Sequence, residues 1–357
     1  MNRKIINTIL SVIFFILVFF ISFIFYKQLF LLNNKNIILV KDKNIKNKII
    51  QEKHKNSKVK LYIWGDIMLS RTVWYFNKKK WYKRILEKYN PVSITWWLVF
   101  FNLESPFSKK PKDNYSNSFY FWSGTWNIEI LKQLKWNNKM IVSLANNHIR
   151  NSLKEWIETT ISLLNKNNIL FNWISTKKHK NNIITKLKLN NLLICLQAFS
   201  YDWWDYWYVK VNKISKKNIK KSLDLMKKQN CDLNLISLHW WTEYKYKPSK
   251  KQVKLAHYII DNGADIIIWH HPHIFWKTEI YKQKPIFYSL GNFIFDQDLI
   301  VNNCNKYRSC IYDEKLKKKI LPVNIWISYE LEFEKHKFIS KIQKKHRLIN
   351  FWELTKY

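Results

Sequence analysis

Polar side chains able to bind a metal ion follow a series of strand-like apolar runs in this chain. Six runs end in such residues: Asp66 after KLYIWGD, Glu104 after LVFFNLE, Asn147 and His148 after KMIVSLANNH, His239 after LNLISLH, His270, His271 and His273 in DIIIWHHPH, and Asn292 after PIFYSLGN. Because the carboxyl ends of strands in an open α/β sheet share one edge, we expect these side chains to meet there. Carboxylate, carboxamide and imidazole groups suit divalent ions such as Mn, Fe, Zn or Mg, and the lack of a nearby Cys argues against a structural zinc site.

Each of these residues alone has a simpler interpretation. Asp66 suits a turn or a helix cap, Asn147 suits a turn, and a lone His239 suits a hydrogen-bonded core position. The HHPH cluster is also compatible with a solvated loop. A metal site is favoured because all six runs end in residues that can bind a metal ion, and these ends are expected to meet at one edge of the sheet.

Six ordered motifs give the chain a family resemblance. The segments GDIMLSR, FNLESP, SLANNHI, SLHWWTEY, DIIIWHHPH and FYSLGNFIFD resemble the CapA family of poly-γ-glutamate capsule biosynthesis proteins. The resemblance covers about Val59 to Asp296 and continues through NIWISYELEF to near Leu348. The family is similar to the calcineurin-like metallophosphatases, which implies an α/β fold built as a four-layer αββα sandwich with a two-metal site.

The resemblance also implies roles for individual residues. The expected metal ligands are Asp66, Glu104, Asn147, His239, His271 and His273; the expected catalytic residues are His148 and Asp66; the expected pocket residues are Asn102, Glu243, Tyr244, His270 and Asn292. His148 falls where metallophosphatases keep a histidine that contacts the scissile group. Two departures stand out, because Met68 replaces the usual histidine of the first motif and Asn102-Leu-Glu104 replaces Gly-Asp. One ion would therefore lack a ligand.

These features favour a hydrolase or transferase with two divalent ions that acts on an anionic capsular polymer such as poly-γ-glutamate. The bond acted on is a phosphoester or an amide. A non-catalytic scaffold that binds the polymer in a capsule synthesis or export assembly is the alternative. The formal charge of +37 suits such a polyanion, although the many Lys, Asn and Ile residues also suit an AT-rich genome. No nucleic-acid-binding motif is present, so nucleic acid is not an expected partner.

Apolar and capping patterns indicate the elements that position these residues. Aliphatic runs alternate with helical patterns, as in a layered α/β domain. Two capping boxes predict helices: Ser152 with Glu155, before apolar positions at Leu153, Ile157, Ile161 and Leu164, and Ser249 with Gln252, before Val253, Ala256 and Ile260. Gly263 is placed to end the second helix.

The amino-terminal part differs in composition from the rest. No charged residue occurs over 5–26, which is long enough to cross a membrane. We therefore expect a leader at 1–4, a transmembrane helix at 5–26, a Lys/Asn-rich tether at 27–57, a folded domain at 58–348 and a tail at 349–357. Arg3 and Lys4 favour a single-pass cell-membrane protein with its domain outside; a cleaved signal peptide is the alternative.

The four cysteines lie in two kinds of sequence surroundings. Cys195 and Cys231 lie in or beside apolar strand-like runs, where inert buried thiols are expected. Cys304 and Cys310 share a polar loop and could form a disulfide in an oxidising compartment.

Tryptophan is unusually frequent and glycine unusually rare. The chain has 19 Trp and 4 Gly, together 23 of 357 residues, close to the ordinary glycine share of about 7%. Trp136, Trp156, Trp173, Trp241 and Trp269 stand where the resembling family favours glycine. We therefore expect most tryptophans to be UGA codons that the source reads as glycine, and we expect crowding at tight turns in the chain as written, above all beside the metal at Trp269.

Overall fold

The computed structural model describes residues 58–71, 73, 97–110, 121–149, 154–172, 184–201, 212–240, 243–245, 247–295, 311–313, 318–320 and 325–347. The chain divides into two compact units, Met1–Asn56 and Ser57–Tyr357. All described residues belong to the second unit.

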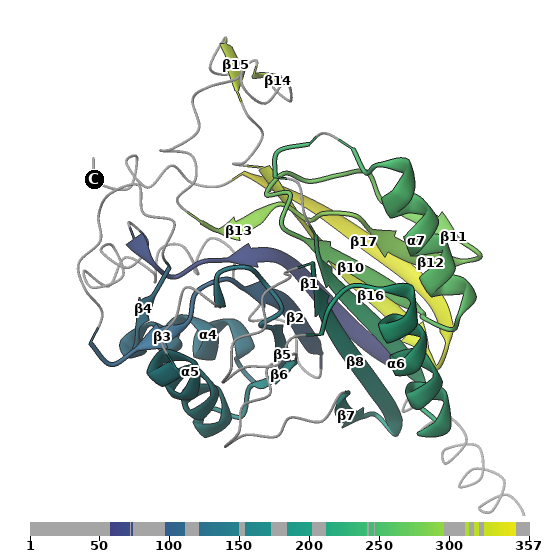
Figure 1. The fold of residues 1–357 in the computed structure, drawn as a ribbon, viewed down its shortest axis with the longest axis horizontal. Helices are drawn as coiled ribbons and strands as arrows, with labels where there is room; N and C mark the ends of the chain where they lie inside the picture. The colour runs from purple at the N-terminus through teal and green to yellow at the C-terminus, as the bar shows by residue number, and fades with distance from the viewer. Residues whose placement is uncertain are drawn as a thin grey trace, which may run out of the picture. The chain divides into compact units, whose positions relative to one another are not determined.

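The first sheet has the order β17-β16-β1-β2-β5-β6, and β13 also pairs with β1 (Figure 1). Its strands are β1 (Lys58–Ile67), β2 (Leu98–Leu103), β5 (Lys139–Ser143), β6 (Leu170–Asn172), β13 (Asn292–Ile294), β16 (Ile325–Glu334) and β17 (Lys337–Arg347). The strands β1, β2, β5 and β6 are parallel, and β16 and β17 are antiparallel. All residues of β2 are buried, as expected for a parallel strand covered on both faces.

The second sheet has the order β11-β12-β10-β9-β8-β7. Its strands are β7 (Thr185–Leu189), β8 (Leu192–Ser200), β9 (Leu233–His239), β10 (Ile266–His270), β11 (Glu279–Tyr281) and β12 (Lys284–Phe287). The central strands β8, β9, β10 and β12 are parallel. Two small pairs complete the strands: β3 (Phe107–Ser108) with β4 (Ser123–Gly124), and β14 (Ile311–Asp313) with β15 (Lys318–Ile320).

Four α-helices and one short 3₁₀ helix are described. They are the 3₁₀ helix Thr125–Asn127, α4 (Ile128–Lys135), α5 (Lys154–Lys166), α6 (Lys216–Lys228) and α7 (Lys250–Asp261). The predicted capping box of Ser249 and Gln252 is confirmed, and Gly263 follows α7 with a φ of +107°. The helix expected after Ser152 is α5, although Ser152 itself lies outside the described residues. Neither α4 nor α6 was predicted.

Alternate residues of β10 show how the layers pack. Ile266 and Ile268 join the core shared by the two sheets, together with Leu61 of β1. Ile267 and Trp269 face the other way, into a core built with helices α6 and α7. The second sheet therefore packs on the first sheet with one face and carries α6 and α7 on the other. The structure confirms a mixed α/β fold with several sheets and few helices.

Two cysteines form a bond that the sequence analysis did not predict. Cys195 and Cys231 are buried as expected, but they are joined in a disulfide with a Cα–Cα distance of 5.9 Å. The expectation of inert thiols was wrong, because β8 and the start of β9 are neighbours and bring the two residues together. Cys304 and Cys310 lie outside the described residues.

The predicted membrane localisation is corrected. Across the described ranges, no helix combines the length and the apolar character that crossing a membrane requires. This finding contradicts the expectation of a single-pass membrane protein. The predicted span over 5–26 lies outside the described residues.

The tryptophans that stand at expected glycine positions have different structural surroundings. Trp136 ends α4 with φ 45° and ψ −131°, a combination that favours glycine. Trp156 lies in α5 against Trp122, and Trp173 and Trp241 lie outside the described residues. Trp269 is fully buried in the core with α6 and α7. The expectation that its indole crowds the metal site was wrong, because residues alternate along a strand and Trp269 faces away from that site.

Candidate metal centre

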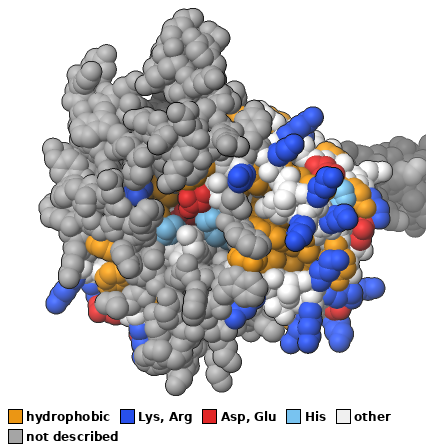
Figure 2. Space-filling model, turned by 45° about the horizontal axis from the view of Figure 1, so that its top comes forward, with side chains coloured by type: hydrophobic (Ala, Val, Ile, Leu, Met, Phe, Trp, Pro, Cys, Tyr) orange, Lys and Arg blue, Asp and Glu red, His pale blue; other side chains and the backbone are white. Residues whose placement is uncertain are grey.

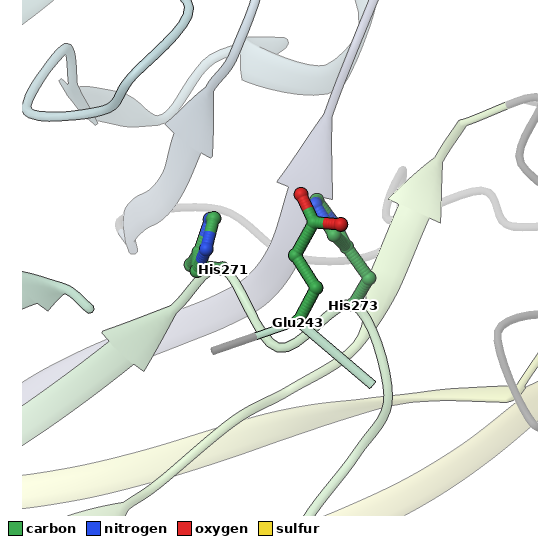
Figure 3. Close-up of side chains that lie close together, drawn as sticks. All are labelled: Glu243, His271 and His273. Atoms are coloured by element: carbon green, nitrogen blue, oxygen red, sulfur yellow. The ribbon is translucent and has the colours of Figure 1, made fainter. Parts of the chain in front are cut away.

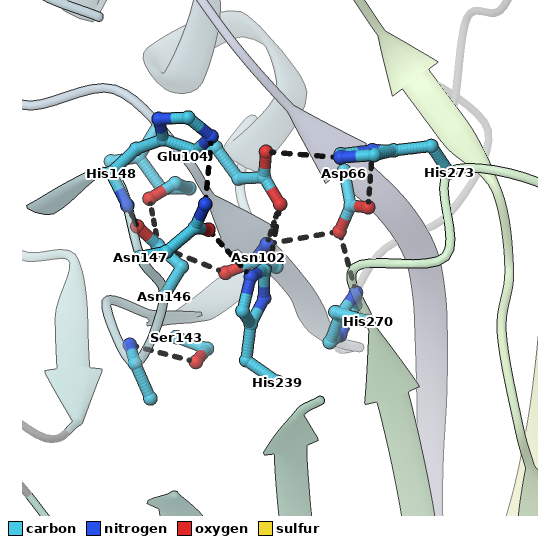
Figure 4. A network of polar contacts seen from close by, with 12 residues as sticks. Asp66, Asn102, Glu104, Ser143, Asn146, Asn147, His148, His239, His270 and His273 are labelled. Carbon is cyan, nitrogen blue, oxygen red and sulfur yellow. Dashed lines mark hydrogen bonds and ion pairs between the residues drawn. The ribbon is translucent and has the colours of Figure 1, made fainter. Parts of the chain in front are cut away.

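The predicted site residues converge at the carboxyl ends of strands from both sheets (Figure 4). Asp66 lies near the end of β1 and Glu104 directly after β2, while His239 and His270 end β9 and β10. All four side chains are at least 96% buried. The topology therefore brings carboxylates of the first sheet against imidazoles of the second.

The two carboxylates share one hydrogen-bond donor. Nδ2 of Asn102 lies 2.9 Å from Oδ1 of Asp66 and 2.8 Å from Oε1 of Glu104. The Oδ1 atom of Asp66 also accepts from Nδ1 of His270 at 2.9 Å. Asn102 and His270, both predicted as pocket residues, thus orient Asp66, as partners of metal ligands commonly do.

His273 lies between the two carboxylates. Its Nδ1 is 3.3 Å from Oδ2 of Asp66, and its Nε2 is 4.0 Å from Oε2 of Glu104. Nδ1 also lies 2.8 Å from Oδ1 of Asn292, the first residue of β13. The three groups form a buried cluster of opposite charges.

Glycine permits the close approach of β1 and β13 that places Asn292 here. A Cβ added at Gly65 would lie 1.9 Å from the carbonyl oxygen of Gly291. The same carbonyl accepts a hydrogen bond from the backbone N–H of Asp66 at 3.0 Å. Any side chain at Gly65 would therefore disrupt this part of the site.

His239 and His148 are linked through Asn147. Nε2 of His239 donates to Oδ1 of Asn147 at 2.9 Å, and Nδ2 of Asn147 lies 3.2 Å from Nε2 of His148. Nδ1 of His239 consequently faces Oε1 of Glu104, at 3.8 Å. The ring of His148 stacks on Phe121 with centroids 3.8 Å apart.

Two groups of side chains have the spacing of metal ligands. Asp66, Glu104 and His273 form one, and Glu243, His271 and His273 form the other (Figure 3); within each, the candidate ligand atoms lie within 4.8 Å of one another. Glu243, predicted only as a pocket residue, thus belongs to the second group. The ring of Tyr244 lies near that of His273, with centroids 6.0 Å apart and the ring planes tilted by 35°.

Lone pairs in this cluster fit a cation. Within the described part of the chain, Oε2 of Glu104 and Nδ1 of His239 are buried without a hydrogen-bond partner, and Oδ2 of Asp66 has only the ion pair with His273. Buried carboxylate oxygens without donors are costly, and a bound ion would satisfy them. The donor set of carboxylates and imidazoles suits Mn, Fe, Zn or Mg.

The pKa values of the two carboxyl groups in the cluster are shifted in opposite directions. Burial alone would raise the pKa of Asp66, but its hydrogen bonds to His270 and His273 hold that pKa well below its usual value. Burial and the charge of Asp66 raise the pKa of Glu104 well above its usual value. Burial opposes the charged form of His273, yet Glu104 and Asp66 raise its pKa to about 10.

The pKa of His239 is shifted in the opposite direction from that of His273, because the nearby carboxylates do not offset the burial of the His239 ring. Burial, and then the charge of His271, hold the pKa of His239 well below its usual value. Its imidazole is therefore neutral, which is the protonation state that binds metals. The hydrogen bond to Asn147 leaves Nδ1 as the atom with the available lone pair.

Two residues of the site were not predicted from the sequence, and Asn146 is the first. Asn146 donates to Oδ1 of Asn102 at 3.1 Å, and its own Oδ1 accepts from the backbone N–H of His148 at 3.1 Å. Its position next to Asn147 in ANNH was a signal that it could have a role.

Arg71 is the second missed residue. It is the only Lys or Arg among the buried residues of the described part, with 7% exposure. Its guanidinium carbon lies 4.6 Å from the ring of Phe121, which stacks on His148, and 5.8 Å from that of Phe295, which contacts His273. The GDIMLSR motif contains Arg71, so its charge near the first strand end was visible in the sequence.

Comparison with known proteins identifies the family. The model for the bacterial capsule synthesis protein PGA_cap matches residues 60–297. The chain belongs to this family. The capsule biosynthesis protein CapA of Bacillus anthracis is 30% identical over 69% of this chain and 62% of its own length. The PGA biosynthesis protein CapA of Bacillus subtilis (strain 168) is 30% identical over 65% of this chain and 62% of its own length. The matched region thus spans less than two thirds of these relatives, and the predicted family is confirmed.

A solved structure resembles the chain more distantly. A hypothetical protein from Thermus thermophilus aligns with a TM-score of 0.47 and 11% identity, over 82% of this chain and 100% of its own.

Proposed function

We propose that this protein carries out a metal-dependent step in the synthesis of an anionic capsular polymer of the poly-γ-glutamate type. The supporting observation is the pair of candidate ligand groups at the strand ends, of which one is fully buried and the other includes the exposed Glu243. The names of two relatives refer to capsule and PGA biosynthesis, and the proposed process is taken from them. In this proposal the two sheets and their helices form the four-layer αββα sandwich of metallophosphatase-like proteins.

Two divalent ions fit the two ligand groups. Asp66, Glu104 and His273 would hold one, and Glu243 and His271 the other, with His239 and Asn147 beside them, because the single lone pair of the His273 imidazole can serve only one ion. Bound ions of this kind polarise a carbonyl or phosphoryl oxygen and make water a better nucleophile. The reaction is therefore a hydrolysis or a group transfer.

The chain's own residues bind the substrate and move protons. His148 lies at the rim of the cluster, 6% exposed, where it can donate a proton to a leaving group. The guanidinium of Arg71 lies beside the ring on which His148 stacks, so it can bind a carboxylate or phosphoryl group of the substrate. Phe121 and Phe295 exclude water around the guanidinium of Arg71.

A test of the reaction compares polymer production by variants of this chain. In a polymer-producing bacterium that lacks its own family member, Asp66→Ala and His271→Ala are each expected to reduce polymer at least tenfold. A surface control, Lys135→Ala at the end of α4, should produce the normal amount. Polymer is measured by gel electrophoresis of cell-surface extracts.

Folding and polymer binding are measured on the same purified variants. The proposal expects both to persist in His271→Ala, because that side chain is not part of the Asp66 network. Normal polymer production by both site variants would contradict chemistry at this site and support the scaffold alternative.

A further inference from the structure

The helices α6 and α7 begin at the same edge of the molecule as the metal centre. β8 ends at Ser200, which pairs with His239, and the backbone of Ile214 returns to donate to Ser200 just before Ser215 caps α6. On the other side, the backbone of Tyr244 donates to Pro272 between His271 and His273. The chain then reaches the cap of α7 at Ser249.

Lysine is concentrated on this helical layer. Helix α6 carries six lysines and one aspartate, and α7 carries three lysines and one aspartate. On the first sheet's side, α4 and α5 together carry four lysines and three glutamates. A lysine-rich genome would load both pairs of helices alike, so composition alone does not explain the difference.

The excess is greatest next to the metal centre. We define the lysine face by the lysines in 212–221 and 243–254: Lys213, Lys216, Lys217, Lys220, Lys221, Lys245, Lys247, Lys250, Lys251 and Lys254. Apart from the candidate ligand Glu243, these two segments contain no acidic residue, and Lys220 forms an ion pair with Asp224 further along α6. Figure 2 shows many Lys and Arg side chains on the side where Figure 1 places α6 and α7, with a few acidic side chains among them, and a further group of acidic and histidine side chains toward the middle.

The placement of these lysines opposes the helix dipole. Neither α6 nor α7 has an acidic residue in its first turn, whereas α4 and α5 have Glu129 and Glu155 there. Positive charge at the amino-terminal end of a helix is unfavourable unless an anion lies nearby. The observed pattern therefore concentrates positive potential where an anionic ligand would offset it.

We propose that the lysine face binds an extended polycarboxylate and guides it to the metal centre. This proposal rests on the proposed function, because it assigns the polymer surface of that same site. All ten cations are lysines, which act as flexible point charges rather than as the planar forks with which arginine matches phosphate. Lysines one turn apart along a helix lie about 6 Å apart, so an extended chain of carboxylates can meet several at once.

The test uses the full chain and two variants of equal charge. The face variant is Lys216→Gln/Lys217→Gln/Lys250→Gln/Lys251→Gln. The control is Lys186→Gln/Lys188→Gln/Lys227→Gln/Lys228→Gln, which removes four lysines from β7 and the opposite end of α6. Affinity for fluorescently labelled poly-γ-glutamate is measured between about 50 and 200 mM salt, roughly the range over which polyelectrolyte contacts weaken steeply.

The face variant is expected to bind the polymer at least tenfold more weakly, with a shallower dependence on salt, while the control stays within twofold of the natural chain. Equal weakening in both variants would overturn the proposal. So would duplex DNA or anionic lipid vesicles of matched charge that displace the polymer equally well, because the surface would then be a general anion binder.

Metal content separates this proposal from the proposed function. The face variant should keep the metal content of the natural chain, because no ligand is changed. The His271→Ala/His273→Ala variant should lose metal but keep polymer affinity. Absence of metal in the natural chain would overturn the proposed function and the guiding role, while polymer binding by the lysine face would stand; polymer binding unaffected by the face variant would overturn this proposal alone.

Discussion

At the scale of single residues, His273 couples metal binding to pH. Glu104 and Asp66 raise its pKa to about 10 despite its burial, and burial together with Asp66 raises the pKa of Glu104. Without an ion, protons therefore occupy the space between these groups at neutral pH. A metal ion has to displace them in order to bind.

Metal affinity should therefore rise with pH. Between about pH 6 and pH 8 we expect up to about a tenfold gain per pH unit for each proton released. Titration calorimetry with Mn²⁺ in buffers of different ionisation enthalpy measures both the affinity and the number of protons released. An affinity that does not change over this range, with no proton release, would contradict the assigned protonation of His273.

Arg71 should determine the affinity of the site for anions. We expect Arg71→Ala to weaken binding of inorganic phosphate to the metal-loaded protein at least tenfold, since a charge-assisted contact is worth about 1.5–3 kcal/mol. Arg71→Lys should bind phosphate with intermediate affinity, because it keeps the positive charge but loses the planar guanidinium that can form two parallel hydrogen bonds. The exposed Lys132→Ala serves as the control, and equal phosphate affinity in all four proteins would refute the role of Arg71.

At the scale of elements, the disulfide joins β8 to the residues just before β9. Residues Cys195 and Cys231 are 36 positions apart, and closing a loop of that length stabilises a fold by up to about 4 kcal/mol. The double variant Cys195→Ala/Cys231→Ala is expected to lower the free energy of unfolding by about 2–4 kcal/mol, measured by urea denaturation. A reducing agent should destabilise the natural chain and leave the variant unchanged; a natural chain insensitive to reduction would show that the bond does not form.

Sequence patterns predicted the local parts of the site better than the contacts between distant parts. The strand ends that carry Asp66, Glu104 and His239 were visible as apolar runs, and the capping box at Ser249 had a clear signature. The hydrogen bond between Asp66 and His270 joins residues 204 positions apart, and only the packing of the two sheets sets that distance.

The sequence pattern also did not predict the direction in which side chains point. Trp269 and His270 are neighbours in sequence, but they face opposite sides of β10. The sequence alone did not show which of the two would face the carboxylates. For the same reason it favoured Asn147 and overlooked Asn146, whose side chain holds the loop together.

At the scale of the whole molecule, glycine and tryptophan usage predicts a recoded chain. Trp136 adopts a backbone conformation that favours glycine, and Trp269 buries an indole N–H that has no hydrogen-bond partner within the described residues. We expect the codons of Trp136, Trp156, Trp173, Trp241 and Trp269 to be UGA, and mass spectrometry of the protein from its natural source should find glycine at these positions. UGG codons at all five would refute recoding.

The central claim for the whole molecule is that its strand ends form a two-ion metal centre. The most direct measurement is an anomalous diffraction map from crystals of the full chain grown with Mn²⁺. Two peaks roughly 3.5–4 Å apart are expected, one against Asp66, Glu104 and His273 and the other against Glu243 and His271. A map without a peak at these side chains under saturating Mn²⁺ would contradict the claim.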